Sequence, residues 1–325
     1  MRDQRTLMIQ NNPVAHALDV VGDGWTMLIL RESFRGAKRF DDWLNRLGIA
    51  RSVLARRLRT LCEAGLYDRV AYQSHPPRHD YLLTAMGRDL FMVGITVNLW
   101  EQTWSRDFHP RHAIRIVQRT DGRTVEPVMS DPADPARALT ARDVEAIPGP
   151  GIDHAPAMRG VRRRQSRAVV AGGAADTAPM DLALETIGSY WTNQIVTASF
   201  FGVTRFDGFM ESIEVSTSVL AERLERLIAD GLLERRLYQE RPARHEYHRT
   251  EAGRALYQPM LAFYAWGARW LCQPGRLPVV LMSRRTGRPF IPALHDALTG
   301  EPLERARVRA APLHAPSRKA RQLVR

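Results

Sequence analysis

The feature that most constrains this chain is an internal duplication. Residues 17–104 align with residues 183–270 at a constant offset of 166 positions without a gap, and 34 of the 88 aligned positions are identical. The best-preserved stretches are Gly22–Thr26 with Gly188–Thr192, Arg39–Asp41 with Arg205–Asp207, Ser52–Ala55 with Ser218–Ala221, and Arg78-His79 with Arg244-His245. Self-similarity at a fixed period marks a repeated structural unit, so the fold of one copy predicts the fold of the other.

Within one copy, the apolar pattern predicts a helix-turn-helix followed by a β-hairpin. Helical spacing of apolar residues and glycine stops define the helices, and alternation defines the strands. The predicted helices are 13–21, 25–34, 41–47 and 50–64, and the predicted strands are 66–72 and 79–83. Because Gly48-Ile49 makes a tight turn between the third and fourth helices, these two form a helix-turn-helix. The hairpin loop, Pro76-Pro77-Arg78, is the wing.

A last helix is predicted from a Thr84 cap to about Trp104. Its apolar residues form a heptad-like seam: Met86, Leu90, Val93, Val97, Trp100 and Trp104. Such a seam suits pairing with another helix, and packing inside its own repeat is an equally open alternative. The second copy has Pro259 inside this helix. We expect a kink there, because proline removes a helical hydrogen bond.

The segments around the repeats complete the organisation. Short apolar runs on either side of Asp121-Gly122 and Thr286-Gly287 predict a β-hairpin after each repeat. The expected fold class is mainly α with small β wings (α+β), as two tandem winged helix-turn-helix domains with hairpin extensions. The expected boundaries are 1–105 for repeat 1, 106–146 for its extension, 147–178 for a linker, 179–271 for repeat 2, 272–304 for its extension, and 305–325 for a basic disordered tail.

Composition excludes several classes of protein. Only Cys62 and Cys272 are present, so neither a disulfide framework nor a multi-cysteine zinc site organises the chain, although one disulfide between them stays open. A polar start without a signal peptide, and no run of about 18 apolar residues, indicate a cytoplasmic protein. No HExxH, GxSxG, Walker or GxGxxG motif stands in a suitable context, so we expect no enzyme, no cofactor and no metal.

The motifs together resemble the HxlR-type winged-helix regulators of the MarR-like group. The resemblance is carried by Ala17–Thr26, Arg39-Phe40, Leu54–Arg69 and Pro76–Gly87, and by their counterparts in the second copy. It covers both repeats, a little over half of the chain. It implies DNA-binding repressors or activators that normally act as homodimers, with one winged domain in each chain. A chain with two such domains therefore resembles a covalently linked dimer.

Two departures from the family pattern narrow the expectations. Many family members have a redox-sensing cysteine just before the N-terminal proline, whereas Asn12 precedes Pro13 and Ala178 precedes Pro179 here. Thiol switching at that position is therefore excluded. Some relatives carry a cysteine-bearing knuckle after the winged domain. The hairpins here look like its remnant but contain no cysteine, so we predict no zinc.

The fourth helix of repeat 1 carries the candidate reading face. Leu54, Leu58 and Leu61 form one stripe that must pack inward. The opposite face is then free to enter a major groove, where arginine binds guanine through two hydrogen bonds. Backbone contacts from flanking residues set register without reading sequence. The candidate DNA contacts are Lys38, Arg39, Arg51, Ser52, Arg56, Arg57, Arg59, Arg78 and His79.

Some of these residues have a structural alternative. Arg57 lies at the flank of the helix, where an ion pair with Asp41 or Glu63 is as consistent with its position as DNA contact. His79 and its counterpart His245 fit equally well as partners of the neighbouring strand. An arginine-rich helix face is often only solvated, but its place in the second helix of a helix-turn-helix, before a basic wing, favours DNA.

The second repeat differs in charge. Its candidate contacts are Thr217, Ser218, Arg223, Arg226, Arg244 and His245. Glu222 and Glu225 replace Arg56 and Arg59, so two carboxylates stand where phosphates would approach, although glutamate can accept a hydrogen bond from cytosine N4. We therefore predict that repeat 1 is the stronger base reader. Repeat 2 reads a different half-site or mainly supplies the pairing surface.

The overall charge points to an anionic partner. The chain carries a formal net charge of +12, with +2 in residues 14–104, −2 in 180–270, +3 in 105–179 and +8 in 271–325. A basic excess favours nucleic acid. The predicted function is a sequence-specific regulator of double-stranded DNA with a two-half-site operator, acting as a repressor, as a pseudo-dimer or as a homodimer. The alternative is a winged-helix ligand sensor or protein-interaction module with reduced DNA binding.

Overall fold

A computed structural model describes residues 3–106, 108, 113–153, 186 and 188–313. Repeat 1 has the predicted order of elements from α2 to β2. Its helices and strands are α1 (Gln4–Gln10), α2 (Pro13–Val21), α3 (Gly24–Phe34), α4 (Phe40–Leu47), α5 (Arg51–Glu63), β1 (Tyr67–Gln73), β2 (Arg78–Leu83), α6 (Ala85–Asp89) and α7 (Phe91–Trp104). The helix-turn-helix α4–α5 and the wing β1–β2 are therefore confirmed, with ends within about two residues of the prediction.

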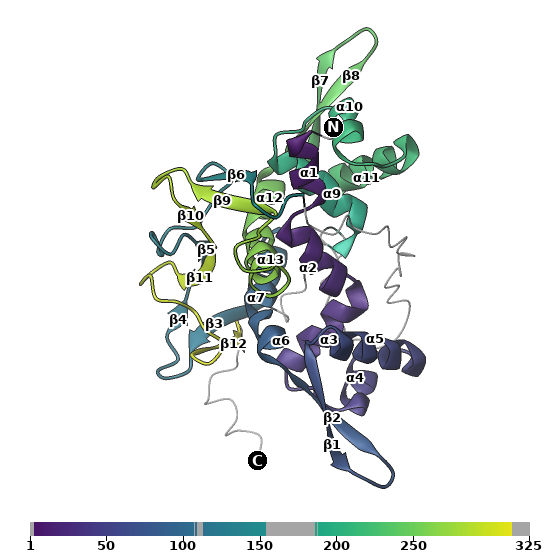
Figure 1. Cartoon of the computed structure of the whole chain (residues 1–325), viewed down its shortest axis with the longest axis vertical. Helices are drawn as coiled ribbons and strands as arrows, with labels where there is room; N and C mark the ends of the chain where they lie inside the picture. Colours follow the sequence, from purple (N-terminus) through teal and green to yellow (C-terminus); the bar gives the residue numbers. More distant parts are fainter. Residues whose placement is uncertain (1–2, 107, 109–112, 154–185, 187, 314–325) are drawn as a thin grey trace, which may run out of the picture.

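Repeat 2 forms the same unit. Its described elements are α9 (Tyr190–Phe200), α10 (Phe206–Ser212), α11 (Thr217–Ala229), β7 (Leu233–Gln239), β8 (Arg244–Arg249), α12 (Glu251–Ala255) and α13 (Tyr257–Trp270). The two winged units lie at opposite ends of the long axis, and their wings point away from each other (Figure 1). The mixed α and β fold class predicted from the duplication is confirmed.

The two extensions exchange their last strands. Repeat 1 is followed by β3 (Ile114–Gln118), β4 (Thr124–Val125), β5 (Pro127–Ser130) and β6 (Val144–Pro148), and repeat 2 by β9 (Val279–Ser283), β10 (Pro289–Phe290), β11 (Ala293–Asp296) and β12 (Val308–Pro312). The predicted hairpins form, as β3–β4 and β9–β10. However, β6 pairs with β9 and β12 pairs with β3, so each sheet is completed by the other half of the chain. Strands β5 and β11 pair across the middle.

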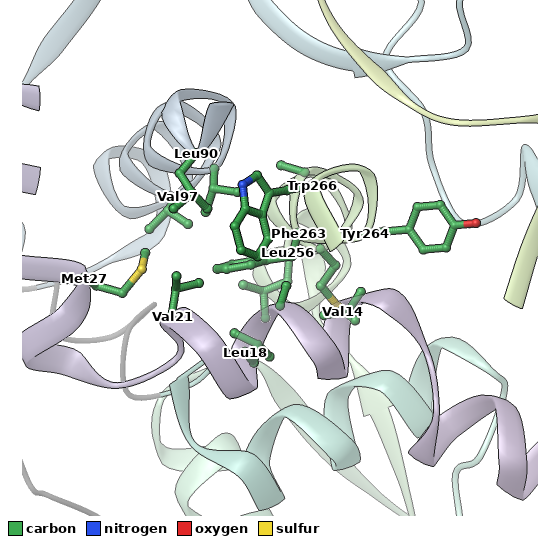
Figure 2. Close-up of a cluster of buried hydrophobic side chains, with 14 of the residues drawn as sticks. Val14, Leu18, Val21, Met27, Leu90, Val97, Leu256, Phe263, Tyr264 and Trp266 are labelled. Carbon is green, nitrogen blue, oxygen red and sulfur yellow. The ribbon is translucent and has the colours of Figure 1, made fainter. Parts of the chain in front are cut away.

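The repeats are joined through a buried three-helix interface. Helix α13 packs against α7 and α2, so the predicted seam serves pairing with a helix of the other repeat. Side chains from all three helices meet there, among them Val14, Val97 and Phe263 (Figure 2). The indole of Trp100 donates to the carbonyl of Ala252, and that of Trp266 donates to the carbonyl of Met86, both at 3.0 Å. These four residues are two pairs at the 166-residue offset, so the contacts are reciprocal.

The prediction of one long helix after each wing is wrong. In both repeats a short helix ends at Asp89 or Ala255, and a new helix starts two residues later, at Phe91 or Tyr257. The expected kink at Pro259 is also wrong. Pro259 lies in the first turn of α13, where no intrahelical hydrogen bond is lost. The break is present in repeat 1 without a proline, so it belongs to the shared fold.

Three boundaries also differ from expectation. Helix α1 was not predicted, and it packs against α9 and α10 of the opposite repeat. Strand β6 continues to Pro148, inside the expected linker, and the remainder of the linker, 154–178, lies outside the described residues. The tail was expected to be disordered from Arg305, but Val308–Pro312 form β12, which pairs with β3. Residues 314–325 lie outside the described part.

Asn12, which precedes Pro13, has a structural role. Its side-chain oxygen accepts from the Ala15 amide at 3.0 Å and so caps α2, while its amide donates to the carbonyls of Met8 and Ile9. The side chain thereby joins α1 to α2. Cys62 and Cys272 are both free thiols. Within the described ranges, none of the helices has the length and apolar character needed to span a bilayer.

We expect Trp100→Phe and Trp266→Phe each to lower the free energy of unfolding by about 1–3 kcal/mol, because each leaves a part-buried carbonyl of the other repeat without its donor. The two losses are similar because the contacts are reciprocal. Urea denaturation measures both. Trp270→Phe is the control. Trp270 is 38% exposed and its indole donates to the Asp89 carboxylate at the surface, where water can replace the contact, so the loss is at most about 1 kcal/mol. Two transitions of unequal midpoint, one for each repeat, would show that the interface does not couple them.

Candidate nucleic-acid interface

The helix-turn-helix of repeat 1 is positioned by a buried tryptophan. Trp43 of α4 is fully buried, and its indole donates to the carbonyl of Ile29 in α3 at 3.0 Å. Gly48 takes a positive φ of 59° in the turn after α4, a conformation that glycine adopts without steric cost. Helix α5 then starts at Arg51. The angle between the two helices is thus set by packing behind α4 and by the turn.

Asp42 fixes the start of α4. Its carboxylate accepts from the amides of Lys38 and Arg39, both at 2.9 Å. Burial alone would raise the pKa of this carboxyl, but the two amide hydrogen bonds, with the charges of Arg46 and Arg39, outweigh burial and hold the pKa below its ordinary value. The carboxylate form is therefore the one that the fold stabilises.

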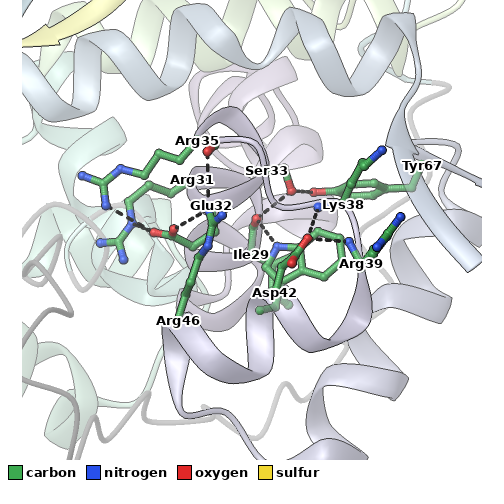
Figure 3. Close-up of polar contacts among 11 residues, drawn as sticks. Ile29, Arg31, Glu32, Ser33, Arg35, Lys38, Arg39, Asp42, Arg46 and Tyr67 are labelled. Atoms are coloured by element: carbon green, nitrogen blue, oxygen red, sulfur yellow. Dashed lines mark hydrogen bonds and ion pairs between the residues drawn. The ribbon is translucent and has the colours of Figure 1, made fainter.

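A buried glutamate ties the ends of α3 and α4 together. Glu32 is 4% exposed, and its carboxylate contacts Arg31 at 2.9 Å, Arg35 at 3.4 Å and Arg46 at 3.6 Å. Figure 3 shows these arginines converging on it, with the Asp42 cap and the Ser33–Tyr67 hydrogen bond nearby. A buried carboxylate requires such pairing. These arginines serve the scaffold and not the outer face.

Helix α5 turns its arginines outward, as predicted. Leu54, Leu58 and Leu61 are at most 1% exposed. The exposed residues on the opposite side include Arg51, Ser52, Arg56 and Arg59. Arg51 lies 3.7 Å from Asp41, with both side chains mostly in solvent, so this ion pair is weak and leaves the guanidinium available. Helices α5 and α11 lie on the same side of the molecule, and the strand extensions lie on the other (Figure 1).

Arg57 differs from its neighbours. Its side chain is only 19% exposed and pairs with Asp23 at 3.2 Å, and Asp23 in turn accepts from the amide of Thr26. The structural alternative therefore has Asp23 as its partner, and the expected partners Asp41 and Glu63 were wrong. Asp23 could have been recognised as the N-cap of the second predicted helix, but apolar periodicity does not identify capping residues.

The wing of repeat 1 is anchored by Asp80. This carboxylate contacts Lys38 at 3.1 Å and Arg39 at 3.2 Å. Burial would raise its pKa, but the hydrogen bonds and charges of Lys38 and Arg39 lower it below the ordinary value. Arg39 also stacks on Tyr72, 4.5 Å from the ring centroid. Both cations keep about half of their surface exposed, so they hold the wing base and still face solvent.

The wing tip carries the remaining candidates of repeat 1. Arg78 is exposed at the start of β2, and His79 is half-buried. A guanidinium nitrogen of Arg69 lies 3.2 Å from Nδ1 of His79, so the suggested partnership of His79 with the neighbouring strand is present. Arg69 is itself exposed. Sequence analysis did not select it, although it recurs as Arg235 at the repeat offset.

In repeat 2 the charged side chains of the corresponding surface pair with one another. Glu225 of α11 pairs with Arg235 of the wing at 3.2 Å, and Arg226 pairs with Asp230 at 3.1 Å. Thr217 and Ser218 are exposed at the start of α11. Their neighbour Ser216 caps this helix and lies 3.2 Å from the Ser218 hydroxyl. Arg223, the counterpart of Arg57, is only 20% exposed.

The second wing repeats the anchor of the first. Arg205 pairs with Glu246 at 3.0 Å and stacks on Tyr238 at 4.4 Å. Arg244 is exposed and His245 half-buried, as in the first wing. Asp80 and Glu246 were not predicted as the anchors of these arginines. The duplication contains a signal for them, because both repeats retain an acid together with the arginine that it binds.

The sequence comparisons agree with this geometry. The profile of the HxlR-like helix-turn-helix family matches residues 20–108 and again residues 186–274, which together are more than half of the chain. The chain belongs to the HxlR-like helix-turn-helix family. It is therefore a DNA-binding transcriptional regulator, and the resemblance inferred from the motifs is confirmed.

Relatives match about one half of the chain. The uncharacterized HTH-type transcriptional regulator Rv3095 of Mycobacterium tuberculosis is 41% identical over 146 residues, which are 44% of this chain and 89% of that protein. The HTH-type transcriptional regulator YodB of Bacillus subtilis is 33% identical over 97 residues, 30% of this chain and 86% of YodB. The solved structure of PA1374 from Pseudomonas aeruginosa is 33% identical, covers 44% of this chain and 97% of that one, and has a TM-score of 0.31.

We expect Asp42→Ala to lower the free energy of unfolding by about 1–2 kcal/mol at pH 7, because the amides before α4 lose their acceptor. The folded-state pKa is depressed, so this contribution is present above the unfolded-state value near ~4 and is lost as pH falls through the folded-state value. Urea denaturation at neutral and acidic pH measures the difference.

The neighbouring Asp41 provides the matched control. Its side chain is 66% exposed and only approaches Arg51, so Asp41→Ala changes the free energy of unfolding by no more than about 0.5 kcal/mol. A loss from Asp42→Ala that stays constant down to acidic pH would contradict the role of the ionised carboxylate.

Proposed function

We propose that this HxlR-family chain is a sequence-specific repressor that binds a two-half-site operator as a single pseudo-dimeric chain. The observation that carries the proposal is the outward face of α5, where Arg51, Arg56 and Arg59 are exposed in the second helix of a helix-turn-helix. A helix of this kind enters the major groove with its N-terminal residues against the base edges. Lys38, Arg39 and Arg78 are the backbone contacts that set its register.

The arrangement of the two repeats supports the use of one chain. Helices α5 and α11 face the same side (Figure 1), and the Trp100 and Trp266 contacts hold the repeats together. Dimeric helix-turn-helix proteins read half-sites one helical turn, about 34 Å, apart. The covalent pseudo-dimer supplies the second reading helix that a one-domain relative obtains from a partner chain.

The two half-sites differ in our proposal. Repeat 1 offers exposed guanidinium groups, which favour guanine-containing sequence. Repeat 2 offers Thr217, Ser218 and Glu222, while its Glu225 is occupied by Arg235. Glu222 only approaches Arg223, at 3.9 Å, and remains 69% exposed, so it can accept a hydrogen bond from cytosine N4. The operator is therefore asymmetric, and the strong half-site lies under repeat 1.

The first test compares equivalent positions of the two reading helices. We expect Arg56→Glu to weaken binding to a duplex selected from a random pool by at least about tenfold, because a guanine contact worth roughly 1–3 kcal/mol is lost and a repelling charge is added. A gel-shift titration at fixed salt measures the dissociation constant.

Glu222→Ala is the matched control at the same position of repeat 2. It is expected to change affinity by less than about threefold or to strengthen binding, because a carboxylate near phosphates is removed. A larger loss from Glu222→Ala than from Arg56→Glu would reverse the assignment of the strong half-site. Equal binding to all random duplexes would instead favour a nonspecific DNA-binding or protein-interaction role.

A second test addresses stoichiometry. We expect the complex with the selected duplex to contain one protein chain, because the helix that would pair with another subunit is already covered by its own second repeat. Sedimentation equilibrium of the complex gives its mass. A complex of two chains on one operator would contradict the single-chain proposal and leave DNA binding itself intact.

A further inference from the structure

The strand extensions carry a charge difference that the reading helices do not explain. Strands β6 and β12 occupy equivalent positions at an offset of 164 residues, and so do β3 and β9 at an offset of 165 residues. The backbone contacts agree, since the Arg119 amide donates to the carbonyl of Arg307, and the Arg284 amide donates to that of Asp143. The two sheets can therefore be compared residue by residue.

The comparison shows a basic sheet beside repeat 1. Arg305, Arg307 and Arg309 in and before β12 correspond to Ala141, Asp143 and Glu145 in and before β6. On the central strands, Arg115 corresponds to Val280. We call the set Arg115, Arg119, Arg305, Arg307 and Arg309 the extension patch.

The two sheets also differ in ion pairing, with fewer carboxylate partners for the arginines beside repeat 1. Arg284 pairs with Glu145 at 3.5 Å, whereas the two equivalent residues, Arg119 and Arg309, are both cations. In the described part of the chain, Arg115, Arg119, Arg305 and Arg309 make no ion pair with a carboxylate, and Arg307 only approaches Glu304 at 3.9 Å. Like charges placed at a cross-strand contact are destabilising. This cost is offset when an anion binds between them.

The patch adjoins the first winged domain. Arg305 lies over the ring of Phe34 in α3 at 5.4 Å, and Arg119 donates to the carbonyl of Val308 at 3.0 Å. Burial lowers the pKa of the Arg305 guanidinium, and the charges of Arg119 and Arg88 lower it further, so Arg88 of α6 faces the same cluster. Through these contacts of Arg305 with Phe34 and Arg88, the patch adjoins α3 and α6 of repeat 1.

We infer that the extension patch is a second, sequence-independent DNA-binding site, which holds the phosphate backbone of DNA flanking the repeat-1 half-site. The inference rests on the proposed DNA binding by α5. Phosphates are the anions that a DNA-bound protein meets at the highest local density, and arginines bind them without reading bases. Because α5 and the strand extensions lie on opposite sides of the molecule (Figure 1), the flanking duplex has to bend strongly around the repeat-1 end to reach the patch. The chain therefore binds its operator with a fixed polarity.

The test transfers the charges of one half to the other. In the double variant Arg307→Asp with Arg309→Glu, the patch receives the residues that the equivalent positions 143 and 145 carry naturally. A carboxylate at position 309 is placed to pair with Arg119, as Glu145 pairs with Arg284, so the fold is retained. Thermal unfolding checks this, and we expect an unchanged or higher midpoint.

Binding is measured on two duplexes, one limited to the selected operator and one extended by about two helical turns, ~20 base pairs, on each side. On the long duplex we expect the double variant to bind at least about tenfold more weakly at ~0.1 M salt, and the slope of log K against log salt to fall by about 2, because two phosphate contacts are lost. On the short duplex its affinity matches that of the unmodified chain. A long duplex of random sequence shows the same loss, because the patch reads no bases.

The reverse variant, Glu145→Arg, is the matched control. Asp143 is left unchanged because its carboxylate accepts from the amide and hydroxyl of Thr140. The reverse variant builds a second patch beside repeat 2 and is expected to tighten binding to the long duplex only. The inference is overturned if the double variant binds the long duplex as the unmodified chain does, or if it weakens both duplexes equally. A failure of the proposed function would give a different result, because no operator would then be selected from the random pool.

Discussion

The packing of α13 against α7 and α2 is the interaction on which the rest of the molecule depends. Neither winged unit completes its own core: Trp100 reaches the carbonyl of Ala252, and Trp266 reaches that of Met86. Apolar side chains of both repeats fill the space between them, including the fully buried Leu256 and Trp266. Burial of this surface removes apolar area from water and fixes the distance between the two ends of the chain. Each reading helix is held in place partly by the opposite repeat.

The strand exchange strengthens this dependence. Since β6 completes the sheet of β9, and β12 completes that of β3, neither extension is closed within its own half. Backbone amides that would lie at an open sheet edge are paired across the pseudo-twofold axis. Helix α1 adds a third crossing, because Gln10 donates to the carbonyl of Ser212 at 3.2 Å. The chain thus has the topology of an intertwined dimer whose subunits are joined end to end.

Local pattern predicted much of this structure, and long-range pairing explains what it missed. The leucine stripe of α5 and the turn at Gly48 were enough to define the helix-turn-helix, because both signals lie within a few residues. The exchange of β6 and β12 was not predictable, since strand alternation says which face is buried and not which distant strand lies beside it. The basic composition of the tail from Arg305 predicts disorder, whereas Val308 is fully buried in the sheet.

In the candidate site, too, local features were predicted and long-range contacts were not. The outward arginines of α5 followed from helical period alone. The anchors Asp80, Glu246 and Asp23 were missed because each acts across tens of residues of sequence, on Arg39, Arg205 and Arg57. Comparison of the two repeats would identify two of these anchors, Asp80 and Glu246. An acid retained at both equivalent positions, beside a retained arginine, indicates a structural ion pair, and an acid present in only one copy indicates a surface that has changed its role.

Covalent linkage gives this divergence its physical basis. In a homodimer every substitution occurs twice, so a carboxylate that neutralises one reading helix also neutralises the other. In this chain Glu225 binds Arg235, while the equivalent positions of repeat 1 hold Arg59 and Arg69. The same replacement of an ion pair by two arginines is present at Arg119 and Arg309 in the extension. Both changes place the additional arginines in one half of the molecule. The buried interface has kept its symmetry because the packing of each half depends on the other, and the exposed surface has lost it because nothing couples the charges of the two ends.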